Sequence, residues 1–263
     1  MVKEKVTKTR NTRKPAVKQP SKHASAKRKG KKKVQKEMPA WCRYLLGVLV
    51  VVVFVSGFYA FFIRPYAYRW KPCYGLKGYG VCMPAGYQVH GIDISHYQGD
   101  IDWKRLAQTR QGRFPVQFIF MKATEGGDYA DKKFVENFDS AKGHGFIRGA
   151  YHFYNPKTDA DKQADFFINT VKLEPGDLPP VLDIEKKSRD VKKLQDDLKI
   201  WLRKVENHYG VKPIIYASYK FKTRYLSDSV FNSYPYWIAH YYVDSVRYQG
   251  EWKFWQHTDV GTL

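Results

Sequence analysis

Seven short apolar runs recur across residues 88–263, and this succession limits the folds open to the chain more than any other feature. Apolar residues between several of the runs repeat with the 3.6-residue period of an amphipathic helix. The runs are VHGIDIS (89–95), VQFIFMKAT (116–124), IRGAYHFY (147–154), PPVLDIE (179–185), KPIIYAS (212–218), YPYWIAHY (234–241) and WKFWQHT (252–258). Apolar strands that alternate with amphipathic helices predict a β/α domain with a largely parallel, buried sheet.

Three helical patterns lie between the runs. Thr158 is a candidate N-cap for the second pattern, and Gly210 follows the end of the third, where a C-terminal cap is expected. The patterns comprise Phe134, Phe138 and Ala141; Ala164, Phe167, Ile168 and Val171; and Val191, Leu194, Leu198, Trp201 and Val205.

Polar side chains gather at the C-terminal ends of the apolar runs. They are Asp93, Ser95, Lys122, Glu125, His152, Tyr154, Asp183, Glu185, Ser218, His240 and Gln256. The alternation of strands and helices alone fits an open sheet as well as a barrel. Polar residues contributed by several strand ends favour a β/α barrel, because active sites of that fold are built on this rim. The cleft expected there is acidic and aromatic, which suits a carbohydrate better than a phosphate.

One run, Pro180–Glu185, places two carboxylates two residues apart. Side chains of a strand alternate between its faces, so Asp183 and Glu185 point the same way. Two like charges in apolar surroundings raise the pKa of at least one of the pair. Glycoside hydrolysis needs such a protonated acid beside an ionised partner. The alternative is that both are solvated carboxylates at a strand end.

The chain shows no sequence signature of a cofactor or metal. It has no Gly-rich loop followed by Lys and Ser or Thr, which argues against a nucleotide enzyme. Its three cysteines form no Cys/His cluster with zinc spacing. We therefore expect neither a metal nor a cofactor.

The formal net charge of +21 is concentrated in the first 43 residues. Residues 1–43 hold sixteen Lys and Arg against two acidic side chains and almost no large apolar residues. Such a segment cannot form a core, so we expect a disordered basic tail. A patch for nucleic acid or anionic lipid remains an alternative. Aromatic residues are not interleaved with the charges, so nucleic acid is the less favoured partner.

Residues 44–63 form an uncharged apolar stretch long enough to cross a bilayer. A cleaved signal peptide is the competing interpretation, but the basic leader exceeds forty residues and no convincing cleavage site follows. We therefore expect an uncleaved transmembrane helix. Eight basic residues precede it within twenty positions and four follow it, which predicts a cytoplasmic N-terminus and an exported domain.

Residues 64–87 are rich in Tyr, Gly and Pro and are expected to form a stem before the domain of residues 88–263. Cys73 and Cys82 bracket a Gly-rich turn, and a disulfide there is plausible in an oxidising compartment. Cys42 is left over on the cytoplasmic side.

The seven runs resemble, in order, the motifs of the family 25 glycoside hydrolases, which are lysozymes. The similar segments are GIDISHYQG (91–99) with IDW (101–103), MKATEG (121–126), GAYHFY (149–154), LDIE (182–185), IYAS (215–218), WIAHY (237–241) and WQHT (255–258). Each motif is short, but seven in the right order are specific, and the resemblance covers about residues 88–263.

The resemblance implies an irregular β/α barrel and a β-1,4-N-acetylmuramidase that hydrolyses peptidoglycan. By that likeness Glu185 is the general acid. Asp183 stabilises charge at the anomeric carbon or orients the 2-acetamido group of the substrate, and Asp93 lies across the cleft and positions sugar or water.

Other residues on these strands are candidates for substrate binding. Aromatic residues in strands more often belong to the core than to a binding site. Of the four aromatic candidates, Tyr151 and Tyr216 are favoured over Phe153 and Trp237. Three polar residues at the strand ends, Gln256, Lys122 and Glu125, are further candidates for substrate binding. The alternative for Lys122 and Glu125 is an ion pair that only holds their loop.

Three hypotheses follow for a protein of the inner (cytoplasmic) membrane. The first is an anchored muramidase for cell-wall turnover or remodelling, working as a monomer. The second is a non-catalytic module that binds peptidoglycan, and the third is a phage-type lysis enzyme. The resemblance also leads us to expect a closing segment with a further Asp and Asn, which would follow the last residue given, Leu263.

Overall fold

The computed structural model describes residues 38–64, 73 and 75–262, which form parts of two compact units, residues 1–59 and 60–263. The basic tail predicted to be disordered comprises residues 1–43. Of these, residues 1–37 lie outside the described residues.

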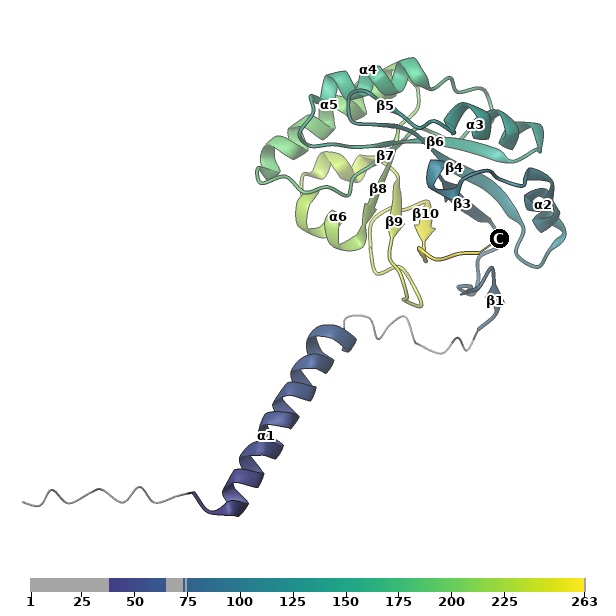
Figure 1. The fold of residues 1–263 in the computed structure, drawn as a ribbon. Coiled ribbons are helices and arrows are strands. Elements are labelled where there is room, and N and C mark those ends of the chain that lie inside the picture. Colours follow the sequence, from purple (N-terminus) through teal and green to yellow (C-terminus); the bar gives the residue numbers. More distant parts are fainter. Residues whose placement is uncertain (1–37, 65–72, 74, 263) are drawn as a thin grey trace, which may run out of the picture. The chain divides into compact units, whose positions relative to one another are not determined.

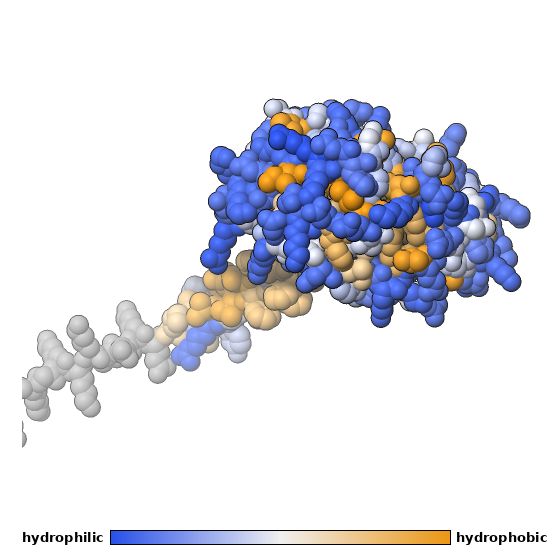
Figure 2. All heavy atoms as spheres, turned by 90° about the horizontal axis from the view of Figure 1, so that it is seen from above, coloured by the Kyte–Doolittle hydropathy of each residue, from blue (hydrophilic) through white to orange (hydrophobic). Residues whose placement is uncertain are grey.

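The first unit contains helix α1 (Ala40–Phe58), which continues as a π-helical turn over Tyr59–Ile63. It begins four residues before the predicted span. Within the 24 residues of Ala40–Ile63, a stretch of 18 residues has a mean hydropathy of 2.6, and none of its residues is buried against the protein. Figure 2 shows their apolar atoms as an exposed orange rod. This helix is a candidate membrane span or signal sequence.

The second unit is built on a curled sheet of eight strands (Figure 1). Seven are parallel and follow the order β10-β9-β8-β7-β6-β4-β3, and short β5 pairs antiparallel with β4. The seven are β3 (His90–Ile94), β4 (Val116–Glu125), β6 (Ile147–Phe153), β7 (Val181–Asp183), β8 (Ile214–Ser218), β9 (Tyr236–Ala239) and β10 (Phe254–Gln256); β5 is Tyr129–Ala130. Each predicted apolar run coincides with one of the seven parallel strands, and only β4 extends beyond its run, by one residue.

Helices connect most of the strands and cover the outer face of the sheet (Figure 1). The three predicted helices are α3 (Phe134–Gly143), α4 (Ala160–Thr170) and α5 (Val191–Tyr209). Gly210 caps α5 in the left-handed conformation, as predicted. The N-cap of α4 is Asp159, whose side chain accepts a hydrogen bond from the Lys162 amide, and not Thr158. The patterns did not reveal the short helices α2 (Trp103–Gln108) and α6 (Tyr219–Tyr225).

Alternate side chains of the strands enter two different apolar layers. One layer fills the concave side of the sheet and includes Phe120, Val181, Ile214 and Trp237. The other layer, between the sheet and the helices, includes Leu182 from the strand residue next to Val181. Burial on both faces explains why the strands are apolar without a period of two. It also fixes which residues of each strand line the inner side.

A disulfide-closed hairpin lies within the predicted stem. Strands β1 (Lys77–Gly78) and β2 (Val81–Cys82) pair antiparallel, and the disulfide joins Cys73 to Cys82. Tyr79 at the turn packs against the main core, and its hydroxyl donates a hydrogen bond to the Phe114 carbonyl. This part of the stem is therefore packed on the domain.

Candidate active site

A cavity of about 250 Å³ lies at the C-terminal ends of the parallel strands. All but one of the candidate residues from the sequence line it, the exception being Glu125. The lining residues are Asp93, Ser95, Tyr97, Lys122, Tyr151, Phe153, Asp183, Glu185, Tyr216, Trp237, Tyr241 and Gln256. Three carboxyl groups, from β3, β7 and the loop after β7, therefore share one small space.

Asp183 is the most buried of the three carboxyls. It ends the central strand β7, its residue is 8% exposed, and its Oδ1 has no hydrogen-bond partner among the described residues. Burial raises its pKa well above the usual range, and the negative charges of Glu185 and Asp93 raise it further. An unpartnered buried oxygen beside a cavity is available to a ligand donor.

Glu185 follows two residues later and is exposed to the cavity. Burial among the surrounding residues raises its pKa, and the charge of Asp93 adds to that rise. The positive charges of Lys122 and Lys186 act in the opposite direction and lower this pKa. Because the three carboxyls repel one another, their site retains a proton at higher pH than isolated carboxyls do.

Asp93 is tied to the opposite end of the sheet through Gln256. The Gln256 Nε2 donates to Asp93 Oδ2 at 2.8 Å, while Oε1 accepts from the hydroxyls of Tyr216 at 2.7 Å and Tyr241 at 2.5 Å. Burial raises the pKa of Asp93, and the Gln256 bond partly offsets that rise. Gln256 thus holds a carboxyl and two phenols in place. The prediction that it binds substrate stays a prediction.

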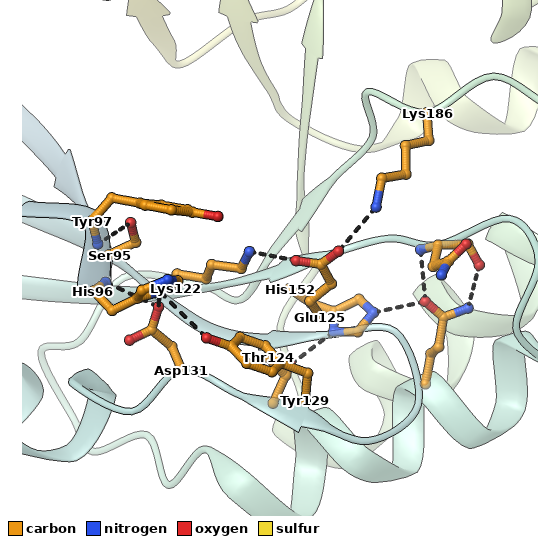
Figure 3. Close-up of polar contacts among 12 residues, drawn as sticks. Ser95, His96, Tyr97, Lys122, Thr124, Glu125, Tyr129, Asp131, His152 and Lys186 are labelled. Carbon is orange, nitrogen blue, oxygen red and sulfur yellow. Dashed lines mark hydrogen bonds and ion pairs between the residues drawn. The ribbon is translucent and has the colours of Figure 1, made fainter.

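Lys122 and Glu125 do form the ion pair considered from the sequence, and a second lysine extends it (Figure 3). Glu125 lies 2.6 Å from the Lys122 Nζ and 2.9 Å from the Lys186 Nζ. The two ammonium groups lie 4.8 Å and 4.6 Å from the centre of the Phe153 ring. This arrangement fixes a positive charge beside Asp183 and Glu185.

The aromatic candidates differ in their surroundings. Trp237 is 7% exposed and stacks on Phe120 at a centroid distance of 4.6 Å, so most of its surface belongs to the inner apolar layer. Tyr151 faces the carboxyl groups, and burial and their charges keep its hydroxyl protonated by raising its pKa well above the usual value. Tyr216 is 6% exposed and has its hydroxyl on Gln256.

The cavity also contains Tyr97, just after β3, and Tyr241, just after β9, which the sequence analysis did not select. Their places just beyond strand ends are the signal that could have identified them. Ser95, which that signal did place at the rim, lines the cavity as well. No group of His, Cys, Asp and Glu side chains within residues 38–64, 73 and 75–262 is arranged to hold a metal ion.

A curled parallel sheet with clustered carboxyls at the C-terminal ends of its strands defines a glycosidase of the β/α-barrel class. A model of the glycosyl hydrolases family 25 matches residues 92–263. The chain belongs to this family, and the family resemblance and the barrel class predicted from the sequence are confirmed.

Several known proteins are similar to the greater part of this chain. The uncharacterized protein YegX of Escherichia coli K12 is 41% identical over 204 residues, which are 77% of this chain and 73% of YegX. Lysozyme M1 of Streptomyces globisporus is 29% identical over 191 residues, covering 66% of this chain and 63% of that protein. A family 25 glycosyl hydrolase structure from Bacillus anthracis has a TM-score of 0.61 and 32% identity, over 66% of this chain and 81% of that chain.

The burial of Asp183 leads to a prediction about stability. A carboxyl whose pKa is raised by folding opposes folding once the pH exceeds its ordinary value of 3.8, and this loss is complete above the folded-state pKa. We expect Asp183→Asn to increase the free energy of unfolding at pH 7 by about 1 kcal/mol or more. The difference in the free energy of unfolding should disappear near pH 3.5. Urea unfolding of the unmodified protein and of Asp183→Asn at the two pH values measures this difference, and equal free energies of unfolding at pH 7 would contradict the prediction.

Proposed function

We propose that this protein is a peptidoglycan hydrolase, a β-1,4-N-acetylmuramidase that cleaves between N-acetylmuramic acid and N-acetylglucosamine. The observation that carries the proposal is the trio of Asp93, Asp183 and Glu185 around one cavity, with raised pKa values. Membership of a family that includes Lysozyme M1 supports the substrate class.

Glu185 is the proposed general acid. A carboxyl that protonates a leaving group must hold its proton near neutral pH and must reach the substrate. Glu185 is exposed to the cavity and has a raised pKa, whereas Asp183 is buried at the end of β7. In the proposed step Glu185 gives its proton to the glycosidic oxygen. The bond from that oxygen to C1 breaks, and its electron pair stays on the oxygen.

Asp183 is the proposed partner of the substrate's 2-acetamido group. Its unpartnered Oδ1 would accept a hydrogen bond from the acetamido N–H. That bond would orient the acetamido carbonyl oxygen to attack C1 and form a cyclic intermediate as the leaving group departs. Water then attacks C1 and gives its proton to the Glu185 carboxylate, while the bond from C1 to the acetamido oxygen breaks and its electron pair returns to the acetamido group. Two inversions at C1 yield net retention.

Asp93 and Gln256 are proposed to position the sugar or the attacking water. Asp93 lines the same cavity as Glu185 and is held by the 2.8 Å bond from Gln256. The bound substrate would also contact Tyr151, Tyr216, Phe153, Trp237 and Lys122. Glu125 would act through Lys122, which it holds by an ion pair.

We further propose that the protein works as a monomer in the inner membrane, anchored through an uncleaved α1 with its N-terminus in the cytoplasm. The apolar helix and the excess of basic residues before it support this orientation. The domain would then act outside the cytoplasm in cell-wall turnover.

Substitution of the proposed acid tests the chemistry. Glu185→Gln keeps the size of the side chain and cannot donate the proton, so we expect at least a ~100-fold loss in the rate of glycan cleavage. Mass spectrometry of digested peptidoglycan should show products of the unmodified protein that end in reducing N-acetylmuramic acid. Glu136→Gln, an exposed change on α3, is the matched control. Undiminished cleavage by Glu185→Gln would refute the assignment, and binding without cleavage by the unmodified protein would favour the non-catalytic module.

The pH dependence of activity provides a separate prediction. Activity should fall as the pH rises through the raised pKa of the acid, because the ionised form has no proton to give. The charge of Lys122 lowers the pKa of Glu185 and Asp183, so Lys122→Met should raise both. The alkaline limb of the profile of kcat/KM against pH should therefore move to higher pH. Lys192→Met on exposed α5 should leave the limb in place, and an unmoved limb in Lys122→Met would count against the electrostatic argument.

The anchor can be tested in membranes. The full chain should stay in the pellet after alkaline extraction, and its intact mass should include residues 1–63. The double substitution Val51→Arg and Val52→Arg should prevent insertion of α1 into the membrane. A charged residue at the centre of a membrane-spanning helix raises the free energy of insertion by about 3 kcal/mol. A mature protein that lacks α1 would show that the segment is a signal sequence.

A further inference from the structure

The loop that follows β3 is held by several polar contacts. The Ser95 amide donates to Gln98 Oε1 at 2.7 Å, and the Tyr97 amide donates to Ser95 Oγ at 3.3 Å. These bonds form a capping box around the short turn His96–Gln98. The turn therefore has one well-defined backbone conformation beside Asp93.

A buried carboxylate fixes the second residue of this loop (Figure 3). Asp131 is 4% exposed, and its Oδ2 accepts a hydrogen bond from the His96 amide at 3.0 Å. The same oxygen lies 2.6 Å from His96 Nδ1. Both the backbone and the imidazole of His96 are thus held by one buried group, which the amide of Lys133 also contacts at 2.9 Å.

Tyr97 lies on this support and is 80% exposed. Its ring packs beside the His96 imidazole at a centroid distance of 4.1 Å and an interplanar angle of 34°. It lines the cavity from the β3 side, while Glu185 lines it from the loop after β7. Single exposed aromatic residues are common on protein surfaces. This one differs because it stands at the mouth of the cavity on a rigid loop.

We propose that Tyr97 is a substrate-contact residue, on which a pyranose ring of the glycan strand stacks. This proposal rests on the proposed function, because it takes a glycan as the ligand. A phenol ring offers apolar area at a low cost in conformational entropy, and the supported backbone lowers that cost further. The C–H face of a pyranose is flat and apolar enough to cover it. Stacking there orients the strand for the carboxyls deeper in the cavity.

The test compares steady-state kinetics of four proteins on soluble peptidoglycan glycan oligomers. Loss of one aromatic contact should raise KM about five- to tenfold in Tyr97→Ala, with kcat within about twofold of the unmodified value. Tyr97→Phe keeps the ring and should restore KM. Tyr129→Ala is the matched control, because Tyr129 packs on the same imidazole at 6.0 Å but does not line the cavity.

Several outcomes would overturn the proposal. They are an unchanged KM in Tyr97→Ala, an equal loss in Tyr129→Ala, or a fall in kcat alone, which a merely structural role would produce. Thermal unfolding of Tyr97→Ala should match that of the unmodified protein, because the side chain is exposed.

Binding in the Glu185→Gln background separates this proposal from the proposed function. Calorimetry with the same oligomers should show weaker binding when Tyr97→Ala is added. If the unmodified protein binds oligomers through Tyr97 but never cleaves them, the proposed reaction fails and the stacking contact stands. If it cleaves them and Tyr97→Ala changes neither KM nor binding, the stacking contact fails alone. Absence of both binding and cleavage rejects both.

Discussion

The burial of the Asp183 carboxyl at the end of the central strand constrains the whole site. Burying the Asp183 carboxyl, one oxygen of which has no hydrogen-bond partner among the described residues, costs free energy, most of all when the group is ionised. The packing of the surrounding residues must offset this cost. That packing is the pair of apolar layers on the two faces of β7, which keep all three of its residues buried. The same burial raises the proton affinity of the carboxyl site, so a strong core and a reactive cleft are produced by one arrangement.

The seam between β3 and β10 shows a second way in which stability and chemistry are joined. These strands end the path of the sheet on opposite sides, and the side-chain bond from Gln256 to Asp93 connects them. Asp93 is therefore both part of the carboxyl trio and an attachment point for the last strand. Lys122 has a similar double role, because its ion pair with Glu125 fixes a loop while its charge lowers the pKa of Glu185.

The sequence predicted the seven parallel strands and three long helices because their apolar patterns are strong. Helices α2 and α6 are too short to show a period, and the cap Asp159 adjoins an equally suitable Thr158. The strand-end rule located Asp93, Asp183 and Glu185. It could not reveal the bond between Gln256 and Asp93, which are 163 residues apart, because that contact depends on the curl of the sheet. The exposure of Tyr97 likewise depends on how its loop is held.

The strand order has a consequence for how the domain assembles. Each parallel strand after β3 pairs with the parallel strand that precedes it in the chain, so the spatial order repeats the order of synthesis. A chain can therefore add one β/α unit at a time to the growing edge of the sheet. The carboxyl trio, which lies on β3, on β7 and just after β7, is complete before β8, β9 and β10 have joined the sheet. The bond from Gln256 to Asp93 forms last, when β10 is added.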